Sequence, residues 1–150
     1  MKISELLTED LIILEASAKD KDSIIKEMAD VLNKAGKIEN EEKFLEAINE
    51  REGLGSTGVG YGIAIPHAKT KAVISPALAF AKSKEGIEYE SLDGEKADIF
   101  FMIAAPEGGE NLHLQTLAKL SRKLIDDDFR ESIRKTETKE SLMKVLSKID

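Results

Sequence analysis

His67 is the first of two histidines in the chain, and it follows a stretch rich in glycine. A neutral imidazole has a lone pair on one ring nitrogen and a proton on the other. If an acceptor holds the N–H, the second nitrogen is free to attack phosphorus, so His67 is a candidate phosphoryl acceptor. Without its flanks, a histidine after a strand and a proline is more often a packed or surface residue.

The residues before His67 favour a site. Glycine lets the backbone approach a bound group closely, and the glycines between positions 53 and 62 indicate amides turned toward a ligand; the alternative is a mobile surface loop. Pro66 has no N–H for a sheet ladder. We therefore expect the strand 63–65 to end at Pro66 and to present His67 at a strand end, where α/β sheets often place their sites.

A phosphoryl group carries about two negative charges, so its site needs cations or hydrogen-bond donors. Arg51 is the best candidate, because a guanidinium can bind two phosphate oxygens at once. The alternative for Arg51 is a surface ion pair with Glu52 or another neighbour. Ser56 and Thr57 are further candidates for binding the phosphoryl group.

His113, the second histidine, falls at the start of a predicted helix, where free amides and the helix dipole favour an anion. We expect it either to hydrogen-bond a phosphoryl group on His67 or to lie half-buried against Leu117, and spacing alone does not separate these alternatives. The alternative is a zinc hydrolase, in which the two histidines would bind zinc together with Asp or Glu. Because the chain has no HExxH or HxH spacing, no metal or other cofactor is expected.

The elements that must position these residues alternate between strands and helices. The predicted strands are 11–14, 63–65, 77–81, 87–89 and 97–105. The predicted helices span about 20–36, 40–51, 112–125, 128–134 and 139–149, with 52–62 as a loop. The fold class is therefore α/β: a single domain over residues 1–150, with a mixed sheet of about five strands flanked by helices.

Composition limits the function further. The absence of cysteine excludes disulfide scaffolds, thiolate metal sites and cysteine nucleophiles. A net charge of -7 argues against nucleic-acid binding, which needs a basic face. The N-terminus lacks the pattern of a signal peptide, and no segment approaches about 18 uninterrupted apolar residues, so we expect a cytoplasmic protein.

The segment REGLGSTGVGYGIAIPHA, residues 51–68, resembles the active-site segment of the fructose/mannitol-type enzyme IIA domains of the bacterial phosphoenolpyruvate:sugar phosphotransferase system. That family includes the nitrogen-regulatory IIA proteins. Its signature has an acidic or amide residue, then an aliphatic and a small residue, then an aliphatic-Ala-aliphatic-Pro-His-small run. Glu52, Val59, Gly60 and residues 63–68 match these positions. The segment HLQTLAKLSRKLIDDDFRESI, 113–133, is similar to the family's second-half helix.

This resemblance implies an enzyme, a phosphotransferase with a phosphohistidine intermediate. His67 would be the phosphorylated nucleophile, His113 a hydrogen-bond donor to the phosphoryl group, and Arg51 the cation that stabilises its charge. The phosphocarrier protein HPr would be the donor. A IIB domain of a sugar permease, with a cysteine in the fructose and mannitol systems, would be the acceptor, so the protein would meet the membrane only through the permease.

The partner surface is expected to be a shallow apolar patch around His67 with a charged rim, to which Leu54, Tyr61 and Ile63 contribute. Two functions stay open: sugar uptake, and a regulatory module whose phosphorylation state controls binding to other proteins, as in the nitrogen-type relatives. The motif does not separate them. It also does not name the sugar, and it leaves open whether the domain is free-standing or part of a larger permease.

Overall fold

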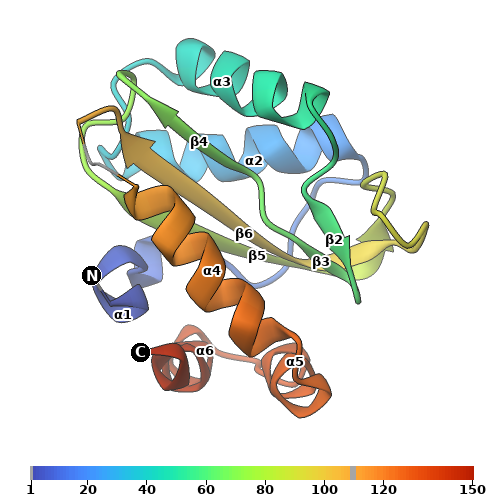
Figure 1. Ribbon diagram of the computed structural model, residues 1–150. Coiled ribbons are helices and arrows are strands. Elements are labelled where there is room, and N and C mark those ends of the chain that lie inside the picture. The colour runs from blue at the N-terminus through green and yellow to red at the C-terminus, as the bar shows by residue number, and fades with distance from the viewer. Residues whose placement is uncertain (1, 109–110) are drawn as a thin grey trace.

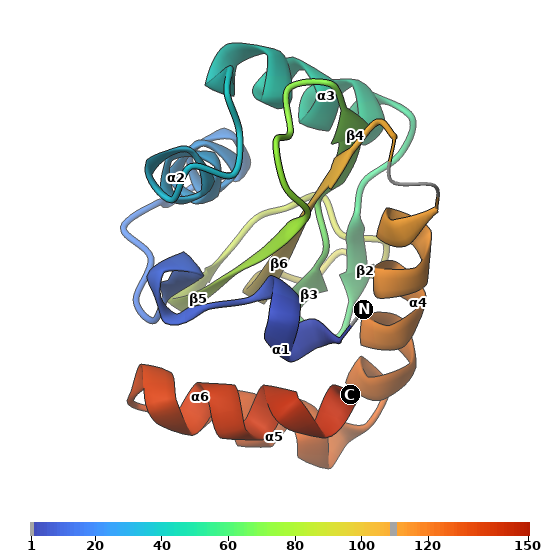
Figure 2. The same ribbon diagram turned by 90° about the vertical axis from the view of Figure 1, so that its left-hand side faces the viewer.

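A mixed sheet of six strands forms the centre of the computed structural model, which describes residues 2–108 and 111–150 (Figures 1 and 2). The strands are β1 Ile12–Ile13, β2 Gly58–Gly60, β3 Ile63–Ala64, β4 His67–Thr70, β5 Ala77–Ile87 and β6 Ala97–Pro106. The helices are α1 Ile3–Leu6, α2 Lys21–Lys34, α3 Glu41–Gly53, α4 Leu112–Leu124, α5 Asp127–Arg134 and α6 Lys139–Leu146, with 3₁₀ turns at Glu9–Leu11 and Ser147–Ile149. The predicted α/β class is confirmed.

Strand β6 is central. It pairs antiparallel with β5 on one side and parallel with β3 and β4 on the other. Its side chains alternate between two cores: Ile99, Phe101 and Ile103 lie in one, and Phe100 and Met102 lie in the other. An apolar run of this kind suits a strand that is covered on both faces, so the prediction for 97–105 is confirmed.

Helices cover both faces of the sheet. In Figure 1, α2 and α3 lie on one side, and α1, α4, α5 and α6 lie on the other. The side chain of Asp20 accepts a hydrogen bond from the Ser23 amide at 2.8 Å, and that of Asn40 accepts one from the Lys43 amide at 3.0 Å. These caps fix where α2 and α3 begin, as the sequence predicted. Within the described ranges, no helix is long and apolar enough to cross a bilayer.

Three predicted elements were wrong in part. The strand predicted at 11–14 is reduced to β1, because Leu11 belongs to a 3₁₀ turn. Residue 87 ends the long strand β5, so no separate edge strand forms at 87–89. The loop predicted at 52–62 contains strand β2, which pairs antiparallel with β3.

The turn between β2 and β3 explains the last difference. Gly60, Tyr61 and Gly62 have φ angles of 105°, 59° and 81°, so three successive residues adopt the left-handed region. The Arg134 guanidinium donates to the Tyr61 carbonyl at 2.9 Å, and Asp98 pairs with the same guanidinium at 2.8 Å. These glycines therefore mark a tight hairpin turn.

Candidate functional site

His67 begins β4 and lies inside the sheet, opposite Ile103 of β6, with 6% of its surface exposed. Its Nδ1 is 2.8 Å from the carbonyl oxygen of Ile65. Because a carbonyl oxygen can only accept, Nδ1 carries the proton and donates, and Nε2 keeps the lone pair. The backbone two residues earlier in the chain thus selects the tautomer of His67.

The strand β3 ends at Ala64, before Pro66, as predicted, but β4 begins directly at His67, so the prediction that His67 would stand at a strand end was wrong. The Ile103 amide donates to the Pro66 carbonyl at 2.9 Å, and the parallel register continues with His67 opposite Ile103. Proline lacks an N–H but its carbonyl still accepts, so β3 and β4 keep one register against β6 on either side of residues 65 and 66. His67 is consequently held within the sheet and largely buried, and does not project beyond a strand end.

Burial is the largest cause that lowers the pKa of His67 below its ordinary value. The positive charge of Arg51 lowers this pKa further, while the hydrogen bond to Ile65 and the charge of Glu52 oppose the shift. The effects that disfavour the positively charged imidazolium outweigh those that favour it. The neutral, nucleophilic ring is therefore the form that the fold favours.

This shift leads to a prediction about pH. We expect His67 to titrate with a midpoint below about 6.5, the ordinary value for histidine. Between its folded pKa and about 6.5 the folded protein binds fewer protons than the unfolded chain, so the free energy of unfolding should fall as pH decreases through that window. NMR titration of the ring protons measures the midpoint, with His113→Ala to assign the signals. A midpoint at or above 6.5 would contradict the expectation.

His113 is the second residue of α4, and its ring centroid lies 6.4 Å from that of His67, with the ring planes 38° apart. Its Nδ1 is buried and has no hydrogen-bond partner among residues 2–108 and 111–150. Burial, followed by the neighbouring His67 and Lys69, lowers the pKa of His113. A buried polar atom without a partner is costly, and a group bound between the two rings could provide that partner. The structure brings the two histidines together, whereas the role of His113 stays a prediction.

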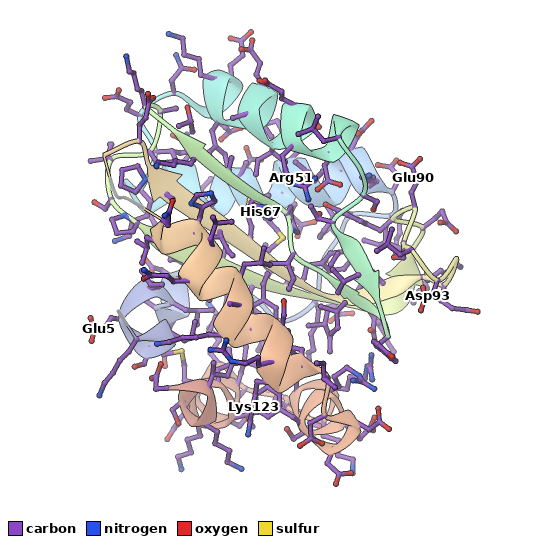
Figure 3. The ribbon with its side chains drawn as sticks, viewed as in Figure 1. Glu5, Arg51, His67, Glu90, Asp93 and Lys123 are labelled. Atoms are coloured by element: carbon purple, nitrogen blue, oxygen red, sulfur yellow. The ribbon has the colours of Figure 1, made fainter. Side chains whose placement is uncertain are left out.

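Arg51 lies in the last turn of α3, and Figure 3 shows it and His67 between α3 and α4 in that view. Its guanidinium NH1 donates to the Gly55 carbonyl at 2.9 Å. The Glu52 carboxylate is paired instead with Lys21 at 3.1 Å, so the alternative of an Arg51–Glu52 ion pair is not what the structure shows. Arg51 is near enough to His67 for its charge to affect the pKa of that ring.

The hydroxyl groups of Ser56 and Thr57 already have protein partners. The Ser56 hydroxyl donates to the Tyr89 carbonyl at 2.9 Å, and the Thr57 hydroxyl hydrogen-bonds the Glu52 carboxylate. Thr57 is also buried, with 3% of its surface exposed. Phosphoryl binding by Ser56 or Thr57 stays a prediction, and it would require these hydrogen bonds to be exchanged.

Four amides of the predicted cradle already have partners within the protein. The amide of Gly55 donates to the Glu52 carbonyl, that of Thr57 to the Glu52 carboxylate, that of Gly58 to Ser56 Oγ, and that of Tyr61 to the Asp93 carboxylate. An N–H that closes a turn or caps a loop is no longer available to a ligand. These four amides therefore shape the loop itself.

Two of the three predicted partner-binding side chains lie at the surface: Leu54 is 82% exposed and Tyr61 is 64% exposed. Ile63 is only 1% exposed, so its prediction as a surface contact was wrong. The strand alternation turns Ile63 inward, where it lines an apolar pocket of about 180 Å³ with Tyr61 and with Ile125, which follows α4. Ile63 can therefore affect a partner surface only indirectly, by packing beneath exposed residues such as Tyr61.

Sequence reasoning missed the partners of Glu52. Glu52 was noted as a signature position and as a possible ion-pair partner of Arg51, yet its buried carboxylate binds Thr57, Tyr89 and Lys21. Lys21 and Tyr89 are far from it along the chain, so no local spacing pointed to them. Within residues 2–108 and 111–150, no three His, Cys, Asp or Glu side chains cluster as a metal site would require.

Comparison with known proteins gives a consistent match over the whole fold. A family profile described as "Phosphoenolpyruvate-dependent sugar phosphotransferase system, EIIA 2" matches residues 5–149. The chain is 47% identical over its full length to a fructose-specific EIIABC component from Bacillus subtilis, of which it spans 24%. It is 42% identical over 98% of its length to a fructose-specific EIIA component from Haloferax volcanii, of which it covers 96%.

Solved structures agree with this match. The nitrogen regulatory protein IIA-Ntr from Neisseria meningitidis superposes with a TM-score of 0.90 and 29% identity, over 96% of this chain and 98% of that one. Enzyme IIAMTL from Escherichia coli, in complex with phosphorylated enzyme IIBMTL, superposes with a TM-score of 0.81 and 25% identity, over 95% and 99% of the two chains.

Proposed function

The chain belongs to the EIIA 2 family of the phosphoenolpyruvate-dependent sugar phosphotransferase system, and we propose that it carries a phosphoryl group on Nε2 of His67. One observation carries this proposal: the Ile65 carbonyl, 2.8 Å from Nδ1, takes up the N–H of the ring and leaves the lone pair on Nε2. A neutral imidazole held in this way needs no general base in order to attack phosphorus.

The donor in this proposal is the phosphohistidine of HPr. The lone pair of His67 Nε2 forms the new P–N bond while the P–N bond of the donor breaks, and the electron pair of that bond returns to the donor ring. The proton on Nδ1 stays in place. Since the phosphorylated ring then shares a positive charge, the carbonyl of Ile65 at 2.8 Å also stabilises the product.

Two neighbouring groups would stabilise the transferring phosphoryl group. Arg51 would supply positive charge and paired N–H donors, and His113 would hydrogen-bond a phosphoryl oxygen from the other side. This binding must stay moderate, because each excess of about 1.4 kcal/mol slows departure of the phosphoryl group roughly tenfold. One guanidinium and one imidazole would bind the phosphoryl group without holding it too tightly for onward transfer.

The acceptor is proposed to be a IIB domain, whose nucleophile takes the phosphoryl group in a second in-line transfer. Support comes from the E. coli relative, whose structure is a complex with phosphorylated enzyme IIB. On this chain, the exposed apolar side chains of Leu54 and Tyr61 are suited to short-lived contacts with such partners. Both of the relatives described above are fructose-specific components, so fructose-type uptake is the proposed transport role.

The test of this function is labelling. The protein is incubated with phosphoenolpyruvate, enzyme I and HPr, and mass spectrometry then locates the phosphoryl group. We expect one acid-labile phosphoryl group, on His67. Label found on His113 instead, or no label in the presence of phosphorylated HPr, would refute the proposal.

A second candidate function is regulation, in which the phosphorylation state controls binding to other proteins. It is favoured by the TM-score of 0.90 with a nitrogen regulatory protein over almost the full length of both chains. The two functions differ in the onward step. Transfer from phosphorylated His67 to a IIB domain supports uptake, whereas a phosphoprotein that no IIB domain discharges supports regulation.

A further inference from the structure

Glu52 directly follows Arg51, and its side chain is 7% exposed. Its Oε1 accepts a hydrogen bond from the Thr57 amide at 3.1 Å and lies 3.1 Å from Lys21 Nζ. Its Oε2 accepts hydrogen bonds from the Thr57 hydroxyl and, at 3.2 Å, from the Tyr89 hydroxyl. Each carboxylate oxygen therefore has two donors, which is what a buried carboxylate needs.

The donors come from three separate parts of the chain. Lys21 is the first residue of α2, Tyr89 follows β5, and Thr57 immediately precedes β2. Lys21 Nζ also lies 4.8 Å from the centre of the Tyr89 ring. Burial raises the pKa of Tyr89, so its hydroxyl stays protonated and remains a donor. The carboxylate thus fixes the end of α3 against two distant elements.

The loop that Glu52 holds leads back to Arg51. The Gly55 amide donates to the Glu52 carbonyl at 3.1 Å, and the Thr57 amide donates to the Glu52 carboxylate. Between these two anchors, the Gly55 carbonyl accepts the hydrogen bond from Arg51 NH1 at 2.9 Å. The carbonyl that Arg51 contacts therefore lies in a short loop that the backbone of Glu52 holds at one end and its carboxylate at the other.

We propose that Glu52 is a positioning residue for phosphoryl transfer: its buried carboxylate fixes residues 54–57 and thereby holds the Arg51 guanidinium toward His67. The proposal rests on the function proposed above for His67. Lys21, 3.1 Å from the Glu52 carboxylate, supplies the positive charge that a buried carboxylate needs. Catalytic groups placed even slightly out of position lose much of their effect.

The first test is Glu52→Gln, which keeps the size of the side chain but replaces one acceptor oxygen by an NH₂ group that faces donors. We expect the rate of phosphoryl transfer from HPr to His67 to fall about tenfold or more. The matched control is Glu90→Gln. Glu90 also pairs with Lys21, at 3.2 Å, but its side chain is 75% exposed, so the same change of charge there should leave the rate unchanged.

The second test separates positioning from a general loss of structure. If Glu52 acts through Arg51, the double variant Arg51→Ala/Glu52→Gln should transfer at the same rate as Arg51→Ala alone, since the guanidinium to be positioned is gone. Thermal unfolding of each variant gives its stability. If Glu52→Gln does not fold, Thr57→Val removes one donor to the carboxylate and should show a smaller loss that likewise disappears without Arg51.

Three results would overturn the proposal. The first is wild-type transfer by Glu52→Gln or, if that variant does not fold, by Thr57→Val. The second is an equal loss in Glu90→Gln. The third is a double variant Arg51→Ala/Glu52→Gln whose loss of transfer rate equals the product of the two single losses. These results are distinct from failure of the proposed function, in which the wild-type protein itself would take no label on His67.

Discussion

His67→Ala is expected to lower phosphoryl transfer from HPr below detection, by more than about a thousandfold. The reason is that the backbone contact of His67 leaves the lone pair on Nε2, as the proposed function requires, and the chain has no cysteine to replace it. The measurement is the rate of ³²P incorporation from labelled phosphoenolpyruvate through enzyme I and HPr.

Two further variants make this result interpretable. Because His67 is 6% exposed, alanine leaves a cavity, so His67→Gln is a second variant that keeps more of the volume and should be equally inactive. His113→Ala retains the nucleophile and should label more slowly but on the same residue. If His67→Gln incorporates label at a rate near that of the wild type, His67 is not the acceptor.

Arg51→Ala is expected to slow the transfer by about 10²- to 10³-fold, as does the loss of one preorganised charge-stabilising donor in other enzymes. Arg51→Lys should recover only part of the rate, because an ammonium keeps the charge but cannot bind two oxygens in one plane. The measurement is kcat/KM with HPr as the varied donor. Lys43→Ala, an exposed cation on the same helix, is the control for the loss of one positive charge.

The same variant has a second readout that does not depend on activity. The charge of Arg51 is one of the causes that lower the pKa of His67, so its removal should raise that pKa in an NMR titration. If Arg51→Ala changed neither the transfer rate nor the pKa of His67, the guanidinium would have no role at the site.

Local patterns account for what the sequence predicted correctly. Asp20 and Asn40 cap α2 and α3 through amides only three residues away, so the start of each helix is visible in a short window. The apolar run of β6 is equally local. His67 and His113 were identified as candidates from their residue type and the residues beside them in the sequence. The fold places their ring centroids 6.4 Å apart.

The mistaken predictions concern contacts made at a distance. Pro66 was expected to leave His67 at the end of a strand because it lacks an N–H, but its carbonyl accepts from the amide of Ile103 and β4 begins at His67. The amides of the glycine-rich loop were expected to face a ligand, but those of Gly55 and Thr57 donate to Glu52 and that of Tyr61 donates to Asp93. No spacing in the sequence shows that Tyr89 and Lys21 meet the Glu52 carboxylate, because α2, α3 and β5 must pack before that contact exists.

The hydrogen bond between Pro66 and β6 limits how readily the backbone at His67 can open. Since the Ile103 amide of the central strand β6 donates to the Pro66 carbonyl, releasing the backbone at His67 requires opening this part of the central sheet. Hydrogen exchange at that amide should therefore follow global unfolding, whether or not the ring is phosphorylated. If His67 is the phosphoryl acceptor proposed above, its backbone is then held in place, and the approach and departure of partner proteins would set the rate of transfer.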